Sequence, residues 1–274
     1  MQIEVIIEKK SHKLDAEEGK TILETLQEHG IHVLTAPCGG RGRCGKCTVE
    51  VEHMGEVLAC MTKVTDGMRI TIPKVQLRAQ KSKIAENGTV THYPADDGEG
   101  LDAACDIGTT TVVCHLIDGK TGEKLATVSE PSAQRSFGAD VLSRIQAAEA
   151  GKLEILKEQI IFQIAQMLRT LQKKTGRGEQ IQRLAVVGNT VMCHLFAGIS
   201  PVSIGVTPFM PQEFFGKEYT GEQLGLTDCR SVYIAPAVAG FVGGDITSDL
   251  LAVMQKNPKE KVLLLDIGTN GEMA

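Results

Sequence analysis

The chain has 274 residues, enough for nearly two average domains, and 42% of them are hydrophobic, which suffices for a sizeable core and excludes a disordered or fibrous protein. A net charge of −5 and an aromatic content of only 4% argue against a nucleic-acid or membrane partner. No segment is apolar over the roughly 18 residues of a membrane helix, and the N-terminus has no signal-peptide core, so we expect a cytoplasmic protein.

The pattern in residues 1–75 predicts a small β-rich domain with one helix. Segment 3–7 alternates apolar and charged residues, which is typical of a half-buried strand. Thr21 followed by Glu24 has the spacing of a capping box and indicates the start of a helix. Further strand-like segments follow at 48–52 and 68–72. This order of elements indicates a β-grasp domain of the α+β class.

Four of the eight cysteines lie within 23 residues of one another: Cys38, Cys44, Cys47 and Cys60. In a reducing compartment such a group indicates a metal site more often than disulfides. Four thiolates suit either Zn²⁺ or a 2Fe-2S cluster. A structural zinc site usually presents two close pairs, whereas here only Cys44 and Cys47 form one. The spacing therefore favours an iron–sulfur cluster, with zinc or free thiols as alternatives.

The loop between these cysteines is rich in glycine and carries only positive charge. Its glycines, at positions 39, 40, 42 and 45, allow the backbone to pass close to a cluster and to point N–H groups at the sulfur atoms. Arg41, Arg43 and Lys46 place positive charge beside the anionic cluster or beside an acidic redox partner, unless they are simply solvated. Residues 1–75 resemble the β-grasp 2Fe-2S ferredoxins, in the variant with five residues between the first two cysteines.

The rest of the chain divides into a polar linker and an α/β region. Residues 76–100 show turn and solvation signals without apolar periodicity and are expected to be a linker. In residues 101–258, apolar strands alternate with helices, which predicts an α/β lobe. A long amphipathic helix is expected from residue 153 to about residue 174, ended by Gly176.

A short repeat identifies the candidate binding residues of this region. The run Asp106-Ile-Gly-Thr-Thr recurs as Asp266-Ile-Gly-Thr-Asn, each time after an apolar run. Glycine permits a tight turn that a phosphate can approach, hydroxyl and N–H groups bind phosphate oxygens, and aspartate holds Mg²⁺ directly or through water. Two such turns indicate a duplicated structure that clamps a triphosphate.

The paired turns resemble those of the actin and sugar-kinase superfamily, whose lobes have the ribonuclease H-like fold. The resemblance implies an ATP-binding lobe over 101–258 and, over 259–274, the first strand and phosphate turn of an incomplete second lobe. It implies ATP and Mg²⁺ as ligands, and Asp245, after a glycine-rich turn, as the catalytic residue that orients Mg²⁺ or the attacking water, unless it merely caps a helix. The implied cofactor-binding residues are Asp106, Gly108, Thr109, Thr110, Gly188, Asn189, Asp266, Gly268, Thr269 and Asn270.

Together the two regions resemble the reductive activators of corrinoid-dependent enzymes. The matching runs include residues 134–144, 187–190 and 235–245. The resemblance implies that the cluster receives an electron from an upstream donor. It further implies that ATP binding and hydrolysis drive Co(II) to Co(I) in a corrinoid protein or corrinoid-dependent methyltransferase.

Other functions remain open on the sequence. One alternative is a plain 2Fe-2S electron carrier whose ATPase region is a non-functional remnant. Another is an ATP-driven electron donor to a different low-potential enzyme, although such donors usually hold a 4Fe-4S cluster between two subunits. A sugar or acid kinase is a third alternative, which the ferredoxin-like region argues against.

Overall fold

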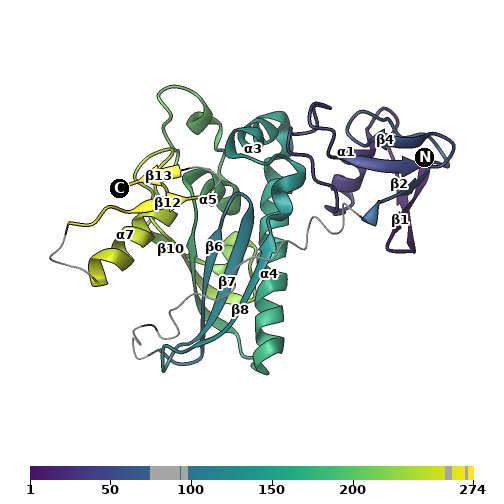
Figure 1. Cartoon of the computed structure of the whole chain (residues 1–274). Coiled ribbons are helices and arrows are strands. Elements are labelled where there is room, and N and C mark those ends of the chain that lie inside the picture. Colours follow the sequence, from purple (N-terminus) through teal and green to yellow (C-terminus); the bar gives the residue numbers. More distant parts are fainter. Residues whose placement is uncertain (75–92, 94–97, 257–260, 269–270) are drawn as a thin grey trace. The chain divides into compact units, whose positions relative to one another are not determined.

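The computed structural model describes residues 1–74, 93, 98–256, 261–268 and 271–274 (Figure 1). The chain divides into two compact units. The first combines Met1–Lys83 with Ala133–Ala147, and the second combines Ile84–Ser132 with Ala148–Ala274. The linker expected at 76–100 falls largely outside the described residues.

A five-stranded sheet forms the first unit, in the order β2-β1-β5-β3-β4. Its strands are β1 (Gln2–Ile7), β2 (Lys10–Asp15), β3 (Thr48–Val51), β4 (Gly55–Leu58) and β5 (Arg69–Thr71). Strands β1 and β5 pair in parallel, and the other neighbours pair antiparallel. The unit therefore has the β-grasp arrangement that the sequence predicts.

Helix α1 (Ile22–Glu28) supplies part of the core of this unit. Ile22 and Leu26 have no exposed surface, and they belong to one cluster with Val5 and Ile70 of the sheet. The predicted capping box is present at the start of the helix. This helix immediately precedes the cysteine loop, so its packing fixes where that loop begins.

Replacing Thr21 by alanine should reduce the stability of the first unit. The Thr21 Oγ1 atom accepts a hydrogen bond from the Glu24 N–H at 3.2 Å, and alanine leaves that N–H without its cap. The expected loss is about 1 kcal/mol, measured by urea unfolding. Thr65→Ala is the matched control because Thr65 is exposed and lies outside the helix. Equal midpoints for the two variants would contradict the capping role.

The first unit also contains a segment from far along the chain, 133–147. It consists of the short helix η1 (Ala133–Ser136) and α3 (Val141–Ala147). The Gln27 side-chain amide donates to the Ser136 carbonyl at 2.9 Å in a buried position. In the sequence this segment lies within the predicted α/β lobe over 101–258, and its contacts with residues over a hundred positions away leave no periodic signal.

A six-stranded sheet forms the second unit, in the order β10-β11-β9-β6-β7-β8. Its strands are β6 (Leu101–Ile107), β7 (Thr111–Asp118), β8 (Lys124–Pro131), β9 (Ile181–Val187), β10 (Lys217–Thr220) and β11 (Cys229–Ile234). Strands β6, β9 and β11 run parallel, so their carboxyl ends lie at one edge. The α/β class expected for this region is confirmed.

The helices of the second unit follow the strands in the expected alternation. Helix α4 (Leu153–Thr175) packs along β7 and β8 and ends at Gly176, which adopts the predicted left-handed conformation (Figure 1). Helix α5 (Thr190–Ala197) follows β9, and α7 (Gly244–Lys256) follows β11. Short elements complete the unit: η2 (Ala148–Lys152), η3 (Val202–Gly205), α6 (Gly221–Leu224) and the hairpin of β12 (Leu265–Ile267) and β13 (Gly271–Met273).

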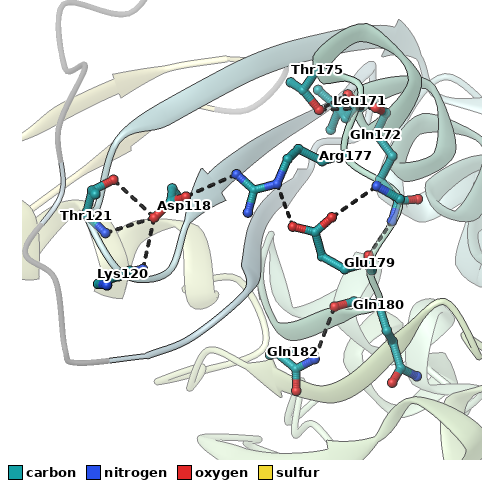
Figure 2. A network of polar contacts seen from close by, with 11 residues as sticks. Asp118, Lys120, Thr121, Leu171, Gln172, Thr175, Arg177, Glu179, Gln180 and Gln182 are labelled. Carbon is teal, nitrogen blue, oxygen red and sulfur yellow. Dashed lines mark hydrogen bonds and ion pairs between the residues drawn. The ribbon is translucent and has the colours of Figure 1, made fainter.

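A polar network lies at the end of this sheet opposite the turn between β6 and β7 (Figure 2). Asp118, at the end of β7, accepts from the backbone N–H groups of Lys120 and Thr121. Its other oxygen accepts from Arg177 Nη1 at 3.1 Å, and Arg177 also pairs with Glu179. The network ties the β7–β8 turn to the connection between α4 and β9. It therefore braces the sheet at the end away from the candidate site.

The four cysteines outside the loop are all buried: Cys105, Cys114, Cys193 and Cys229. Cys105 and Cys114 face each other across β6 and β7 with their Sγ atoms 2.8 Å apart. They pack as small core residues, in agreement with the sequence analysis. Within the described ranges, no helix combines the length and the apolar character needed to cross a membrane.

Candidate functional site

The cysteine loop runs between α1 and β3, and the fourth cysteine follows β4. Its four glycines all have positive φ, between 63° at Gly45 and 81° at Gly40. Residues other than glycine rarely adopt this backbone conformation, so the loop can coil tightly only with glycine at these positions. The Ala59 N–H donates to the Cys47 carbonyl at 2.9 Å, which brings Cys60 back beside the loop.

The four cysteines come together as two pairs. The Sγ atoms of Cys38 and Cys44 lie 3.3 Å apart, and Cys47 lies close enough to Cys60 to raise the pKa of its thiol. Each iron of a 2Fe-2S cluster takes two protein thiolates, so a two-by-two arrangement fits its ligand requirement. The pairing therefore favours a two-iron cluster over zinc.

Backbone N–H groups of the loop point at the cysteine sulfurs. Burial opposes ionisation of Cys38, but hydrogen bonds from the Cys44, Arg43 and Arg41 N–H groups and from the Cys44 thiol outweigh it and lower its pKa to about 6. Burial and the neighbouring Cys47 raise the pKa of Cys60 to about 12, against the effect of the Gly42 N–H. Donors already aimed at sulfur are what an anionic iron–sulfur cluster requires.

A second candidate site lies at the carboxyl edge of the parallel strands of the second unit. The turn after β6 contains Thr109, which is buried and accepts a hydrogen bond from the Asn189 side-chain amide at 3.0 Å. Asn189 also caps α5 by accepting from the Met192 N–H. The Asp245 N–H, at the start of α7, donates to the Gly188 carbonyl at 3.3 Å. Three strand ends are thus joined by direct bonds.

Close backbone approaches explain the glycines of these turns. A Cβ at Gly188 would lie 2.8 Å from the Ile107 carbonyl oxygen, and one at Gly108 would lie 2.6 Å from the Thr111 carbonyl oxygen. Only glycine fits at these distances, so the turns after β6 and β9 can approach each other. The predicted group Gly108, Thr109, Gly188 and Asn189 is therefore brought together by the fold. Thr110 lies on the same turn with its side chain exposed.

Carboxylates gather beside this group. Partial desolvation, together with the charges of Asp245, Asp249 and Asp266, raises the pKa of Asp106 to about 7, although the side chain is exposed on one side. Burial and the charges of Asp266 and Asp249 also raise the pKa of Asp245, against hydrogen bonds from backbone N–H groups that include Ile246. The neighbouring negative charges thus disfavour ionisation of Asp106 and Asp245. A bound cation would relieve this repulsion.

The fold adds two acidic residues that the sequence analysis missed. Asp249 lies one helical turn after Asp245 on α7, and Glu272 pairs with Asp266 in the β12–β13 hairpin. Burial and the charges of neighbouring carboxylates raise the pKa of both. The helical spacing of Asp249 was a usable signal. Gly268 follows β12 as expected, whereas Thr269 and Asn270 lie outside the described residues.

Comparisons with known proteins assign a family to each of the two regions. Residues 4–74 match the family of 2Fe-2S iron-sulfur cluster binding domains, and residues 101–257 match the family described as the RACo middle region. The second match covers more than half of the chain. The chain belongs to the RACo family. The match confirms the family that the sequence motifs indicate.

Relatives of this RACo-family chain are named for corrinoid chemistry. It is 28% identical over 320 residues to the corrinoid activation enzyme RamQ of Eubacterium limosum, a match that covers 88% of this chain and 54% of RamQ. It is 28% identical over 189 residues to the Co(II) methylated amine-specific corrinoid protein reductase of Methanosarcina barkeri, covering 62% of this chain and 33% of that protein. The chain thus spans about half the length of RamQ and a smaller share of the Methanosarcina barkeri protein.

A solved structure extends the agreement to the fold. A reductive activator for corrinoid,iron-sulfur protein superposes with a TM-score of 0.61 at 26% sequence identity. The match covers 99% of this chain and 61% of the solved chain. The order of elements described above is therefore shared with an activator over the length of this chain.

Proposed function

We propose that this RACo-family chain reductively activates a corrinoid protein, transferring one electron that converts Co(II) to Co(I), with MgATP binding and hydrolysis driving the transfer. The observation that carries this proposal is the presence, in one chain, of a two-by-two cysteine loop and a carboxylate-lined turn at the strand ends. The names of the relatives support the corrinoid partner. The proposed partner is a corrinoid protein or a corrinoid-dependent methyltransferase, and an upstream electron donor supplies the electron.

The cysteine loop performs the electron-transfer part. Cys38, Cys44, Cys47 and Cys60 would hold the cluster, which when bound takes up and releases one electron. The loop N–H groups stabilise the negative charge at the sulfurs, and this stabilisation sets the potential at which the electron is held. Cys47 and Cys60 are only 1% and 7% exposed, so the protein excludes water from that pair.

The turns of the second unit perform the nucleotide part. Gly108, Thr109 and Thr110 would bind phosphate oxygens through backbone N–H and hydroxyl groups. Asp106 and Asp266 would hold Mg²⁺ directly or through water, and Asp245 would orient Mg²⁺ or the attacking water. Asn189 positions the Thr109 hydroxyl through the bond described above.

The strand order supports an actin-like lobe for this unit. Strands β6, β7 and β8 form an antiparallel meander, and β9 and β11 extend the sheet in parallel on the other side of β6. Helices α4 and α5 provide the connections to β9 and toward β11. This arrangement places both ends of the β6–β7 turn at the edge where a phosphate is expected to bind.

An anaerobic reduction assay tests the proposal. The reduced chain is mixed with a purified cob(II)alamin-containing corrinoid protein, and formation of Co(I) is followed by its visible absorption with and without MgATP. We expect Co(I) to accumulate only when MgATP is present. Accumulation without any effect of MgATP, together with no heat of MgATP binding in calorimetry, would instead support a plain electron carrier. No electron transfer to the corrinoid would overturn the proposal.

A further inference from the structure

The charges of the cysteine loop suggest where an electron leaves the first unit. From His29 to Val49 the chain contains three basic residues and no acidic one: Arg41, Arg43 and Lys46. All three side chains are exposed. The first 74 residues as a whole are nearly balanced, with ten Lys or Arg and eleven Asp or Glu. The positive charge is therefore concentrated on the stretch between the cluster ligands.

The two cysteine pairs are not equally close to solvent. Cys47 and Cys60 are buried, whereas Cys38 and Cys44 are half-buried. An iron held by Cys38 and Cys44 would lie nearer the surface, beneath the basic stretch that joins these two residues. Electron transfer weakens steeply with distance, so the more exposed pair marks the side on which a partner must dock.

The chain itself occupies another side of the same loop. The Ala139 N–H donates to the Pro37 carbonyl at 3.3 Å, and a Cβ at Gly39 would lie 3.5 Å from the Phe137 carbonyl oxygen. These contacts are made by segment 133–147 within the first unit. At Gly45, in contrast, a Cβ would meet no atom within 4 Å. At Gly42, between Arg41 and Arg43, a Cβ would meet only the side chain of Met61, which is itself 62% exposed. Apart from Met61, the basic residues therefore lie on a side of the loop that segment 133–147 leaves uncovered.

We propose that residues Arg41–Lys46, here called the basic arc, form the electron-exit surface and dock an acidic protein surface around the partner's redox centre. The inference rests on the proposed function only in taking a cluster on this loop as donor to a protein partner. Opposite charges at such a surface raise the rate of encounter and fix the orientation of the partner.

Two small oxidants of opposite charge test the basic arc without a corrinoid or a nucleotide. The reduced chain is mixed in a stopped-flow instrument with ferricyanide, an anion, or with hexaamminecobalt(III), a cation. In each reaction the cluster loses one electron to the oxidant. The Fe(III) of ferricyanide becomes Fe(II), or the Co(III) of hexaamminecobalt becomes Co(II). The variant Arg41→Gln/Arg43→Gln is compared with Lys10→Gln/Lys13→Gln on β2, which removes the same charge from exposed positions outside the loop.

We expect the arginine variant to react about tenfold more slowly with ferricyanide and faster with hexaamminecobalt(III) at low ionic strength. Added salt should reduce both differences, and the lysine variant should match the wild type. If the arginines only tune the cluster potential, both rates will change in the same direction, which would overturn the inference. The inference would also be overturned if the ratio of the ferricyanide rate to the hexaamminecobalt(III) rate were the same in the arginine variant as in the lysine variant. Unchanged visible absorption and EPR spectra exclude loss of the cluster as the cause.

Discussion

Replacement of Cys47 by alanine is expected to abolish cluster binding and, with it, all electron transfer. Cys47 belongs to the buried pair with Cys60, where no water can take the place of a missing thiolate. One iron would then keep a single protein ligand, which cannot retain a 2Fe-2S cluster. Iron and acid-labile sulfide should fall from about two atoms of each per chain to near zero, and the visible absorption should vanish.

Cys229→Ala provides the matched control for this loss. Cys229 is 2% exposed, close to the 1% of Cys47, so the same loss of a thiol group occurs at an equally buried position. It lies on β11 in the second unit, outside the cysteine loop. The control should keep its full iron content and spectrum at the cost of a small loss of stability. A Cys47→Ala chain that still binds stoichiometric iron and sulfide would refute the ligand assignment.

Asp106→Asn is expected to stabilise the ligand-free chain while weakening its binding of Mg²⁺. Burial and the charges of Asp245, Asp249 and Asp266 raise the pKa of Asp106 from 3.8 to about 7. Because the folded pKa lies above the unfolded one, the contribution of this group to stability is present below pH 3.8 and is lost as the pH rises to 7. An uncharged asparagine avoids that loss.

The measurement is the melting temperature at two pH values with and without MgCl₂. At pH 8 the Asn variant should melt about 2–4 °C above the wild type, and at pH 4 the two should agree. Added Mg²⁺ should stabilise the wild type, whereas the variant should bind it about 10–100-fold more weakly. Glu158→Gln is the control, because Glu158 is exposed on α4 and lies outside the acidic group. A variant that melts lower at pH 8, or that gains as much stability from Mg²⁺ as the wild type at every concentration, would contradict this role.

Local signals were sufficient to predict most of the fold. Thr21 with Glu24 marked the start of α1, and Gly176 marked the end of α4, because caps depend on residues only a few positions apart. The cysteine spacing and the repeated Asp-Ile-Gly-Thr turn identified both candidate sites for the same reason. The motifs also sufficed to name the family to which the chain belongs.

The features that were missed depend on long-range contacts. The inclusion of segment 133–147 in the first unit rests on bonds such as that from Gln27 to Ser136, which no periodicity encodes. Likewise, the contribution of Glu272 to the acidic group requires the pairing of β12 with β13. The division of the cysteines into a buried and a half-buried pair could not be predicted, because it depends on the packed core around Cys47.

The bond between Gln27 and Ser136 also limits how this protein can be divided or recombined. A fragment cut at the sequence linker would contain every cluster ligand but would leave segment 133–147 behind. Its buried Gln27 amide would then lose the acceptor that satisfies it, and the Pro37 carbonyl beside the first ligand would lose its donor. Joining sequences at the linker alone would therefore transfer every cluster ligand without the two contacts that segment 133–147 makes beside them. An exchange that preserves the packing of the first unit must transfer two separate pieces of chain.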